Sequence, residues 1–337
     1  MIIKLKPGIK AEKLAALKRR LSGLLPGAEF SSGRGAIAVN APAPELLGRR
    51  LAEIENLPGI AAAELSLREA CPLAVTAAPP NLDALYGKGR LKNFIFIAGP
   101  CAVEDEASYL TAAKKLKAAG VCALRAGLFK PRTSPYAFQG LGARGFGIVK
   151  KAARATGLAA VIEATSEQHL SAIKSAGGIA QIGARNMRNY ELLKAAARTG
   201  LPVLLKRAPG ATLKEWLLSA EYLLKHGNGE VILCERGDSF SRSGLRGLNL
   251  EILRAALNST ALPVIADPCH ATGDRALVPA QALAAVRAGA DGLMIEAALD
   301  PGTALMDGRQ TLSIPEFAAL VKLIKELLNK TGKRENI

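Results

Sequence analysis

The amino-acid sequence predicts an α/β protein, in which a (β/α)8 TIM barrel is preceded by a small ferredoxin-like α+β domain. Eight short apolar runs between residues 93 and 330 are each followed by an amphipathic helical pattern. The runs do not alternate with polar residues, which is typical of parallel strands buried on both faces. Residues 1–70 show instead a β-α-β-β-α-β order. A doubly wound open sheet is the alternative that the same repeat allows.

The small domain, residues 1–70, is predicted to begin with an apolar strand at 2–5. An amphipathic helix is expected at 11–25, strands near 29–32 and at 35–40, a second helix at 46–56 and a last strand at 60–67. Residues 71–92 contain Pro72, Pro79 and Pro80, which indicate a linker. Residues 331–337 are charged and are expected to form a frayed tail.

The barrel domain is predicted to cover residues 93–330. Its strands are expected at 94–98, 121–124, 159–162, 179–182, 202–205, 230–234, 263–266 and 292–295. Its helices are expected at 105–119, 145–156, 166–175, 189–199, 213–226, 248–257, 274–288 and 314–329. Loops that enter the strands consist mostly of small residues, whereas loops that leave them carry charge. Since such barrels place their active sites where the strands end, this asymmetry predicts a catalytic mouth there.

The overall composition favours an enzyme acting on small anions. The net charge is +16, but only 4% of the residues are aromatic and the cations are scattered. A nucleic-acid binder would show a basic stripe with interleaved aromatic residues, so no nucleic-acid partner is expected. No apolar run approaches the ~20 residues that span a bilayer, and the first residues do not resemble a signal peptide, so we expect a cytoplasmic protein without a membrane partner. The five cysteines include no CxxC pair, so neither a disulfide framework nor a zinc knuckle is indicated.

Cations gather at the predicted strand ends. Arg125, Lys130 and Arg132 fall within eight residues, in a loop that Pro131 and Pro135 stiffen. Further cations follow three later strands, namely Arg185, Lys206 and Arg236. Six cations at one mouth suit one or two substrates that carry at least two phosphate groups, because Arg and Lys form charge-assisted bonds to phosphate.

A second set of side chains at the strand ends could bind a metal. Cys101 follows the first strand, His270 the seventh, and Glu296 and Asp307 the eighth. These strands are neighbours in a closed barrel. A thiolate, an imidazole and two carboxylates suit Mn²⁺, Fe²⁺, Co²⁺ or Zn²⁺. Their spacing is not a compact metal motif, so a buried cysteine, a capping aspartate and two surface groups remain an alternative interpretation.

Several stretches together resemble the 3-deoxy-D-arabino-heptulosonate-7-phosphate (DAHP) synthases, in the subfamily with an N-terminal ferredoxin-like domain. They are AGPCAVE (98–104), FKPRTSPYAFQGLG (129–142), IGARNM (182–187), LLKR (204–207), CERG (234–237), DPCHATG (267–273) and ALMDGRQ (304–310). The similar 3-deoxy-octulosonate-8-phosphate synthases carry Lys-Ala-Asn-Arg in the second loop. Here Lys130-Pro131-Arg132 lacks the inserted asparagine, which favours the heptulosonate enzymes.

The resemblance implies a condensation of phosphoenolpyruvate with erythrose 4-phosphate, the first step of the shikimate pathway to aromatic amino acids. It implies that one divalent metal ion (Mn, Fe, Co or Zn) is bound by Cys101, His270, Glu296 and Asp307 and acts as a Lewis acid. It assigns phosphoenolpyruvate to Arg125, Lys130, Arg185, Lys206 and Arg236, and erythrose 4-phosphate to Arg132 and Thr133. Within that chemistry, Lys130 is the candidate that protonates the developing alkoxide, and Glu163 or Glu235 could orient water.

Some positions depart from the family pattern. Residues 297–299 are Ala-Ala-Leu where the family usually reads Val-His-Pro, and residues 164–166 are Ala-Thr-Ser where it often reads Val-Met-Asp. The loop 238–243 differs, and Asn249 replaces the usual aspartate. Two alternatives therefore stay open: a related synthase that uses another phosphorylated aldose, and a weakly catalytic regulatory barrel. We also expect a homo-oligomer, in which the small domain either binds an aromatic amino acid effector or only stabilises the assembly.

Overall fold

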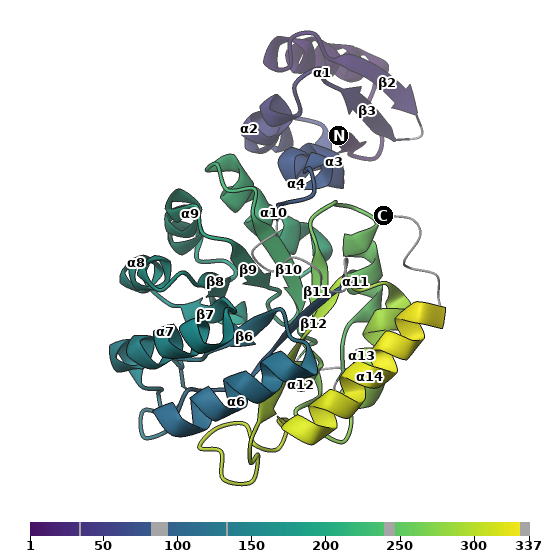
Figure 1. The fold of residues 1–337 in the computed structure, drawn as a ribbon. Helices are drawn as coiled ribbons and strands as arrows, with labels where there is room; N and C mark the ends of the chain where they lie inside the picture. The colour runs from purple at the N-terminus through teal and green to yellow at the C-terminus, as the bar shows by residue number, and fades with distance from the viewer. Residues whose placement is uncertain (34, 82–93, 133, 239–246, 331–337) are drawn as a thin grey trace. The chain divides into compact units, whose positions relative to one another are not determined.

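The computed structural model describes residues 1–33, 35–81, 94–132, 134–238 and 247–330. The chain divides into two compact units, Met1–Thr76 and Ala77–Ile337 (Figure 1). The division lies six residues beyond the predicted end of the small domain, because residues 67–76, expected as strand end and linker, form the short helices α3 (Leu67–Ala70) and α4 (Pro72–Thr76). Each unit is described by itself below.

The first unit has the predicted ferredoxin-like order. Its strands are β1 (Ile2–Leu5), β2 (Glu29–Gly33), β3 (Ala36–Asn40) and β4 (Ile60–Glu64), and its longer helices are α1 (Ala11–Leu24) and α2 (Pro44–Glu55). The sheet order is β2-β3-β1-β4, and every neighbouring pair is antiparallel. Leu17 and Leu21 of α1 pack with Ile37 and Ile54 in one apolar core, which is the burial that stabilises an otherwise marginal small domain.

The second unit is a closed parallel barrel. Its strands are β5 (Ile95–Gly99), β6 (Ala123–Arg125), β7 (Ala160–Ala164), β8 (Ile179–Ile182), β9 (Val203–Lys206), β10 (Val231–Glu235), β11 (Val264–Ala266) and β12 (Gly292–Ala298). Each of these pairs with the next, and β12 pairs with both β5 and β11. This closure confirms the TIM barrel and excludes the open sheet.

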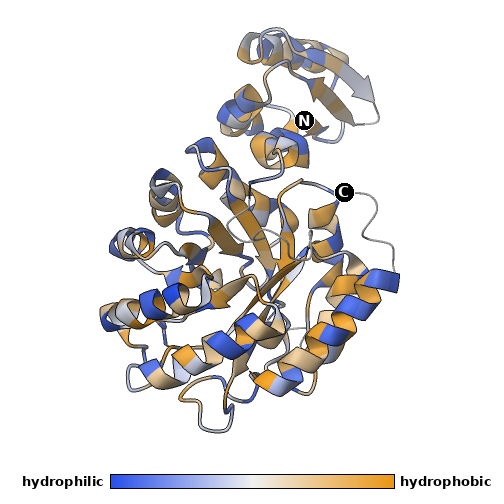
Figure 2. Cartoon of the chain, viewed as in Figure 1, coloured by the Kyte–Doolittle hydropathy of each residue, from blue (hydrophilic) through white to orange (hydrophobic). Residues whose placement is uncertain are grey.

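Helices alternate with the strands and surround the barrel (Figure 1). They are α6 (Glu106–Ala119), α7 (Gly145–Thr156), α8 (Glu167–Ser175), α9 (Tyr190–Thr199), α10 (Leu213–Lys225), α11 (Leu250–Leu257), α13 (Val278–Ala288) and α14 (Ile314–Lys330). Figure 2 shows mostly apolar strands, whereas the helices carry both apolar and polar residues. The sequence did not predict the one-turn helix α12 (Pro268–Thr272) or the short strand β13 (Leu312–Ser313), which pairs with β12.

The barrel interior is filled by alternate residues of each strand, as the period of two requires. Ile97, Ala123, Val161, Leu204 and Cys234 belong to one buried apolar cluster inside the barrel. The next inward position along each strand, two residues further on, lies at the mouth. This alternation decides which polar residue at a strand end faces the mouth and which faces the surrounding helices.

In the part of the chain that the structure describes, no helix combines the length and the apolar character needed to cross a membrane.

Candidate active site

A cavity of about 620 Å³ opens at the mouth of the barrel. It is lined by the predicted cations Arg125, Lys130, Arg132, Arg185, Lys206 and Arg236. The structure therefore brings together cations from four different βα loops. Thr133, predicted to contact the second substrate, lies outside the described residues. Such a concave site with convergent charged groups is suited to a small polyanionic ligand.

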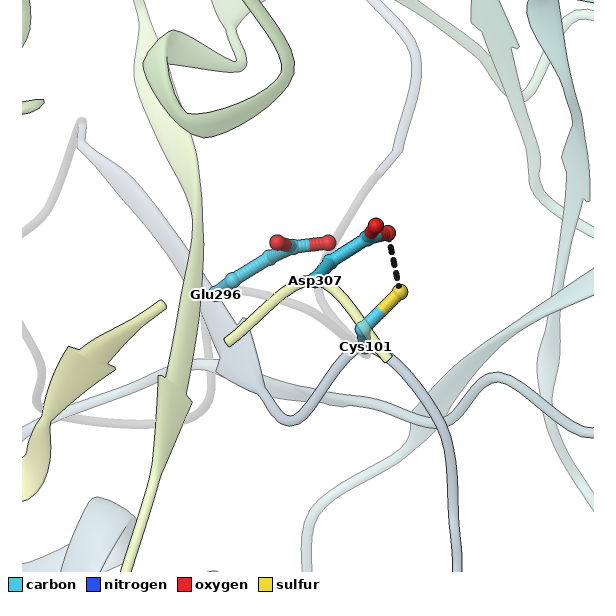
Figure 3. Close-up of side chains that lie close together, drawn as sticks. All are labelled: Cys101, Glu296 and Asp307. Carbon is cyan, nitrogen blue, oxygen red and sulfur yellow. Dashed lines mark hydrogen bonds between the residues drawn. The ribbon is translucent and has the colours of Figure 1, made fainter. Parts of the chain in front are cut away.

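Three of the four predicted metal ligands converge at one side of this mouth. The ligand atoms of Cys101, Glu296 and Asp307 all lie within 4.8 Å of one another, and Figure 3 shows the three side chains pointing toward a common point. The Cys101 thiol donates a hydrogen bond to Asp307 Oδ2 over 3.0 Å. His270 lies beside this group rather than within it, with Nε2 3.5 Å from Glu296 Oε1.

The chemistry of these groups fits a divalent cation. Glu296 is 1% exposed and receives a hydrogen bond from Gln310 on Oε2, at 2.7 Å, but among the described residues its Oε1 accepts none. Arg125 Nη1 lies 2.6 Å from Oε1 without hydrogen-bond geometry. Burial opposes ionisation of Glu296, yet the charges of Arg125 and His270 outweigh it and lower the pKa to about 2. This ionised oxygen accepts no hydrogen bond among the described residues and is paired with the Arg125 charge, which is a setting suited to a metal ligand.

The Cys101 thiol is also suited to binding a divalent cation. Burial, reinforced by the charge of Glu296, raises its pKa to about 12, so in the absence of a cation it stays protonated. A metal ion deprotonates a coordinating thiol. Asp307 adds a local backbone cost, because its φ of 55° lies in the left-handed region that residues with a side chain rarely adopt. Strain of this kind is found most often at functional sites.

Asp267 contacts both a cavity cation, Lys206, and a candidate metal ligand, His270. The sequence analysis gave it no role. It is fully buried and forms an ion pair with Lys206, and its Oδ2 lies 2.8 Å from His270 Nδ1. Its Oδ1 also accepts the backbone N–H of His270 at 3.0 Å. The carboxylate favours an N–H at Nδ1, so Nε2 is the ring nitrogen that would bind a metal. Burial opposes its ionisation, but His270 and Lys206 hold the pKa of Asp267 well below 3.8.

Glycines allow the polar side chains to approach the backbone. A Cβ on Gly127 would lie 2.6 Å from Lys130 Nζ and would overlap the Cys101 carbonyl oxygen, so Lys130 lies beside the candidate metal ligands only because residue 127 is glycine. A Cβ on Gly183 would likewise overlap the carboxylate of Glu163. The loop that contains Lys130 is held by Arg185, which donates a hydrogen bond to the Pro131 carbonyl.

The two glutamates proposed to orient water differ in position. Glu163 lines the cavity, as does Gln181 on the neighbouring strand, which the sequence analysis missed. Glu235 does not line it. Its side chain is fully buried on the outer face of β10, where Arg207 and two backbone N–H groups bind both carboxylate oxygens. Glu235 therefore faces away from the cavity, as the alternation along β10 requires.

Comparisons with known proteins agree with this geometry. The model of the DAHP synthetase I family matches residues 75–332. A phospho-2-dehydro-3-deoxyheptonate aldolase of Thermotoga maritima is 40% identical over 255 residues, which cover 75% of this chain and 75% of that protein. A crystal structure of a DAHP synthase from the same organism is 33% identical, covers 98% of both chains and has a TM-score of 0.81. A 2-dehydro-3-deoxyphosphooctonate aldolase of Nitratidesulfovibrio vulgaris is 31% identical over 74% of this chain and 96% of its own length.

Proposed function

The chain belongs to the DAHP synthetase I family of transferases, and on that premise we propose that it condenses phosphoenolpyruvate with erythrose 4-phosphate in a metal-dependent reaction that releases phosphate. This reaction is the first step toward the aromatic amino acids. The observation that supports it most is one cavity that joins cations from four loops to a cluster of Cys101, Glu296 and Asp307.

The charges of the cavity suit these two substrates. Phosphoenolpyruvate offers a carboxylate and a phosphate, and erythrose 4-phosphate a second phosphate. Lys206 and Arg125 line the cavity as buried cations, 4% and 3% exposed, whereas Arg132 and Arg185 line it as exposed ones. We assign phosphoenolpyruvate to Arg125, Lys130, Arg185, Lys206 and Arg236, and the phosphate of the sugar to Arg132 and Thr133. Because these cations are held in place before binding, they stabilise anionic charge with little reorganisation.

The proposed reaction forms one carbon–carbon bond and breaks one carbon–oxygen bond. Carbon 3 of phosphoenolpyruvate forms a bond to the aldehyde carbon, and the aldehyde oxygen takes a proton from Lys130, which lies beside Cys101. Water then adds to carbon 2 and gives a proton to Glu163, the carboxylate that lines the cavity. The bond between carbon 2 and the phosphate oxygen then breaks, the carbon 2 hydroxyl becomes the ketone carbonyl, and its proton leaves with inorganic phosphate.

The metal would be held by Cys101, His270, Glu296 and Asp307. When bound there, a divalent cation supplies Lewis-acid polarisation of the aldehyde. Asp267 fixes the imidazole of His270, and Gln310 fixes the carboxylate of Glu296. Such supporting contacts orient metal ligands and tune their basicity.

Loss of the enol absorbance of phosphoenolpyruvate tests this function. We expect consumption that requires erythrose 4-phosphate, stops with a chelator and returns with Mn²⁺. Lys130→Met should abolish it, whereas Lys151→Met, which removes an exposed lysine paired with Glu106, should not. Consumption with arabinose 5-phosphate but not with erythrose 4-phosphate would assign the chain to another aldose. Binding of phosphoenolpyruvate without any turnover would indicate a regulatory barrel.

The small domain is proposed to serve regulation or assembly. Residues 1–70 form a compact sheet with its own core, which suits either role. Inhibition of turnover by tyrosine or phenylalanine, lost on deletion of this domain, would establish an effector site. A homo-oligomer that dissociates on the same deletion, without inhibition, would establish the assembly role.

A further inference from the structure

We propose that Arg207, which never reaches the cavity, is a positioning residue that fixes Lys206 and Arg236 for phosphoenolpyruvate. Together with Glu235 and Asp238 it forms a buried ion-pair network on the outer side of the barrel, which we call the Arg207 network. The inference rests on the proposed function, since it concerns how two of the proposed substrate cations are held.

The alternation along the strands places the network behind the cavity. Leu204 and Cys234 point into the barrel, so Lys206 and Arg236 follow on the inner side and line the cavity. Arg207 and Glu235 occupy the intervening outward positions. Each of the two strand ends therefore carries one residue for the cavity and one residue for the network.

Arg207 is fully buried and all three of its nitrogens are used. Its Nε and Nη2 bind both oxygens of Glu235, and Nη2 also lies 2.8 Å from Asp238 Oδ1. Its Nη1 donates to the carbonyls of Ala208 and Ala211, at 3.2 and 2.9 Å. A planar, forked cation is suited to bonding in so many directions, which a lysine cannot reproduce.

The carboxylates extend the network across two βα loops. Asp238, in the loop after β10, accepts the backbone N–H of Gly210 in the loop after β9 at 2.7 Å. Glu235 accepts the backbone N–H groups of Gly237 and Asn249, at 2.7 and 3.1 Å. The network therefore joins the loop that follows Lys206 to the loop that contains Arg236.

The inner side of the same strand ends is held as well. Lys206 forms an ion pair with Asp267, and Arg236 donates to the carbonyl of His270 at 3.3 Å. With bonds on both faces, the two cations keep their separation before any anion arrives. Preorganisation of this kind improves affinity, because less freedom is lost when the ligand binds. Removal of the outer bonds would let the two loops move independently.

Two variants test the inference by direct titration with phosphoenolpyruvate in the presence of Mn²⁺. Asp238→Asn removes the charge of a carboxylate that is 27% exposed, so the fold should tolerate it. Arg207→Lys keeps the positive charge but loses the fork. We expect each variant to bind phosphoenolpyruvate at least tenfold more weakly and to raise its KM, with the KM for erythrose 4-phosphate changed less than twofold. Arg188→Ala is the matched control, because it breaks the exposed Arg188–Glu215 pair outside the cavity.

The packing behind β9 can be checked in the same samples. Trp216 is the single tryptophan of the chain, is fully buried, and donates to the Leu205 carbonyl at 3.3 Å. Native tryptophan emission at 20 °C would show that a variant is folded. If both folded variants bind phosphoenolpyruvate with wild-type affinity, the inference is wrong, even if their melting temperatures are lower. If Arg207→Lys does not fold, Asp238→Asn decides alone. A wild-type protein that does not bind phosphoenolpyruvate would instead refute the proposed function.

Discussion

Replacement of Asp267 by asparagine should destabilise the barrel, although the side chain keeps its shape. Asp267 is fully buried between Lys206 and His270. Removal of one partner from a buried ion pair costs about 3–5 kcal/mol, because the other charge is left unpaired. For a domain of this size, ~3 kcal/mol corresponds to a decrease in melting temperature of roughly 6–12 °C. The metal should also bind about 10–100-fold more weakly, since the asparagine no longer orients the His270 ring as the carboxylate does.

Urea unfolding followed by Trp216 fluorescence measures the first effect, with a chelator present. Titration with Co²⁺, followed by its thiolate absorption band, measures the second. Glu106→Gln is the control, because the exposed Glu106–Lys151 pair should contribute at most about 1 kcal/mol. If Asp267→Asn unfolds at the wild-type urea concentration and binds Co²⁺ with wild-type affinity, the carboxylate is neither paired nor positioning His270.

The pH dependence of the free energy of unfolding gives a further test of Asp267→Asn. The pKa of Asp267 in the folded, metal-free protein lies well below 3.8. A carboxyl group with a lowered folded pKa stabilises the protein above its unfolded pKa, and this stabilisation is lost as the pH falls through the folded value. The stability difference between wild type and Asp267→Asn should therefore be constant above about pH 5 and shrink only below about pH 4. A difference that disappears near neutral pH would mean that the native aspartate is protonated.

Three further changes test other parts of the site. Cys101→Ala should abolish the cobalt–thiolate band and metal-dependent turnover while the fold stays intact, and surviving activity would remove Cys101 as a ligand. Gly183→Ala should displace the carboxylate of Glu163 and lower kcat by roughly tenfold or more, with unchanged affinity for phosphoenolpyruvate. Unchanged kcat would show that Glu163 is not the proton acceptor. Asn249→Asp should lower the free energy of unfolding by roughly 1 kcal/mol, because the Asn249 amide donates to Asp238 at 3.2 Å and a second carboxylate would repel it. Equal urea midpoints would contradict this.

The fold could be predicted because the barrel strands are apolar on both faces. Residues 179–182 were predicted as a strand, and β8 (Ile179–Ile182) has those bounds. The bounds of β1 and α7 were also predicted, and the other elements differ by at most four residues at either end, since a cap such as Asp105 lies outside the helix that it starts. Helix α12 was missed, because its five residues follow a strand directly and show no helical period.

The sequence identified most residues near the barrel mouth, but it did not identify which of their side chains face the cavity. Strand ends identify which residues are near the mouth, yet Glu235 and Arg236 are adjacent in sequence and face opposite sides. The period of two from Val161 and Ile179 would have selected Glu163 and Gln181 and excluded Glu235. The ion pairs of Asp267 and Arg207 could not be read from the sequence, because they join neighbouring strands that are far apart along the chain.

The charge of the proposed metal should affect how strongly the cavity cations bind the anionic substrates. The cavity cations exceed the carboxylates Glu163, Asp267, Glu296 and Asp307 by two charges when His270 is neutral. Phosphoenolpyruvate and erythrose 4-phosphate together bring about five negative charges near neutral pH. Two of the cations are already paired, since Arg125 faces Glu296 and Lys206 faces Asp267. A divalent cation held by Cys101 would add one net positive charge once the thiol is ionised, and it would share the Glu296 carboxylate with Arg125. Metal binding should therefore raise the affinity for phosphoenolpyruvate even before the aldehyde arrives.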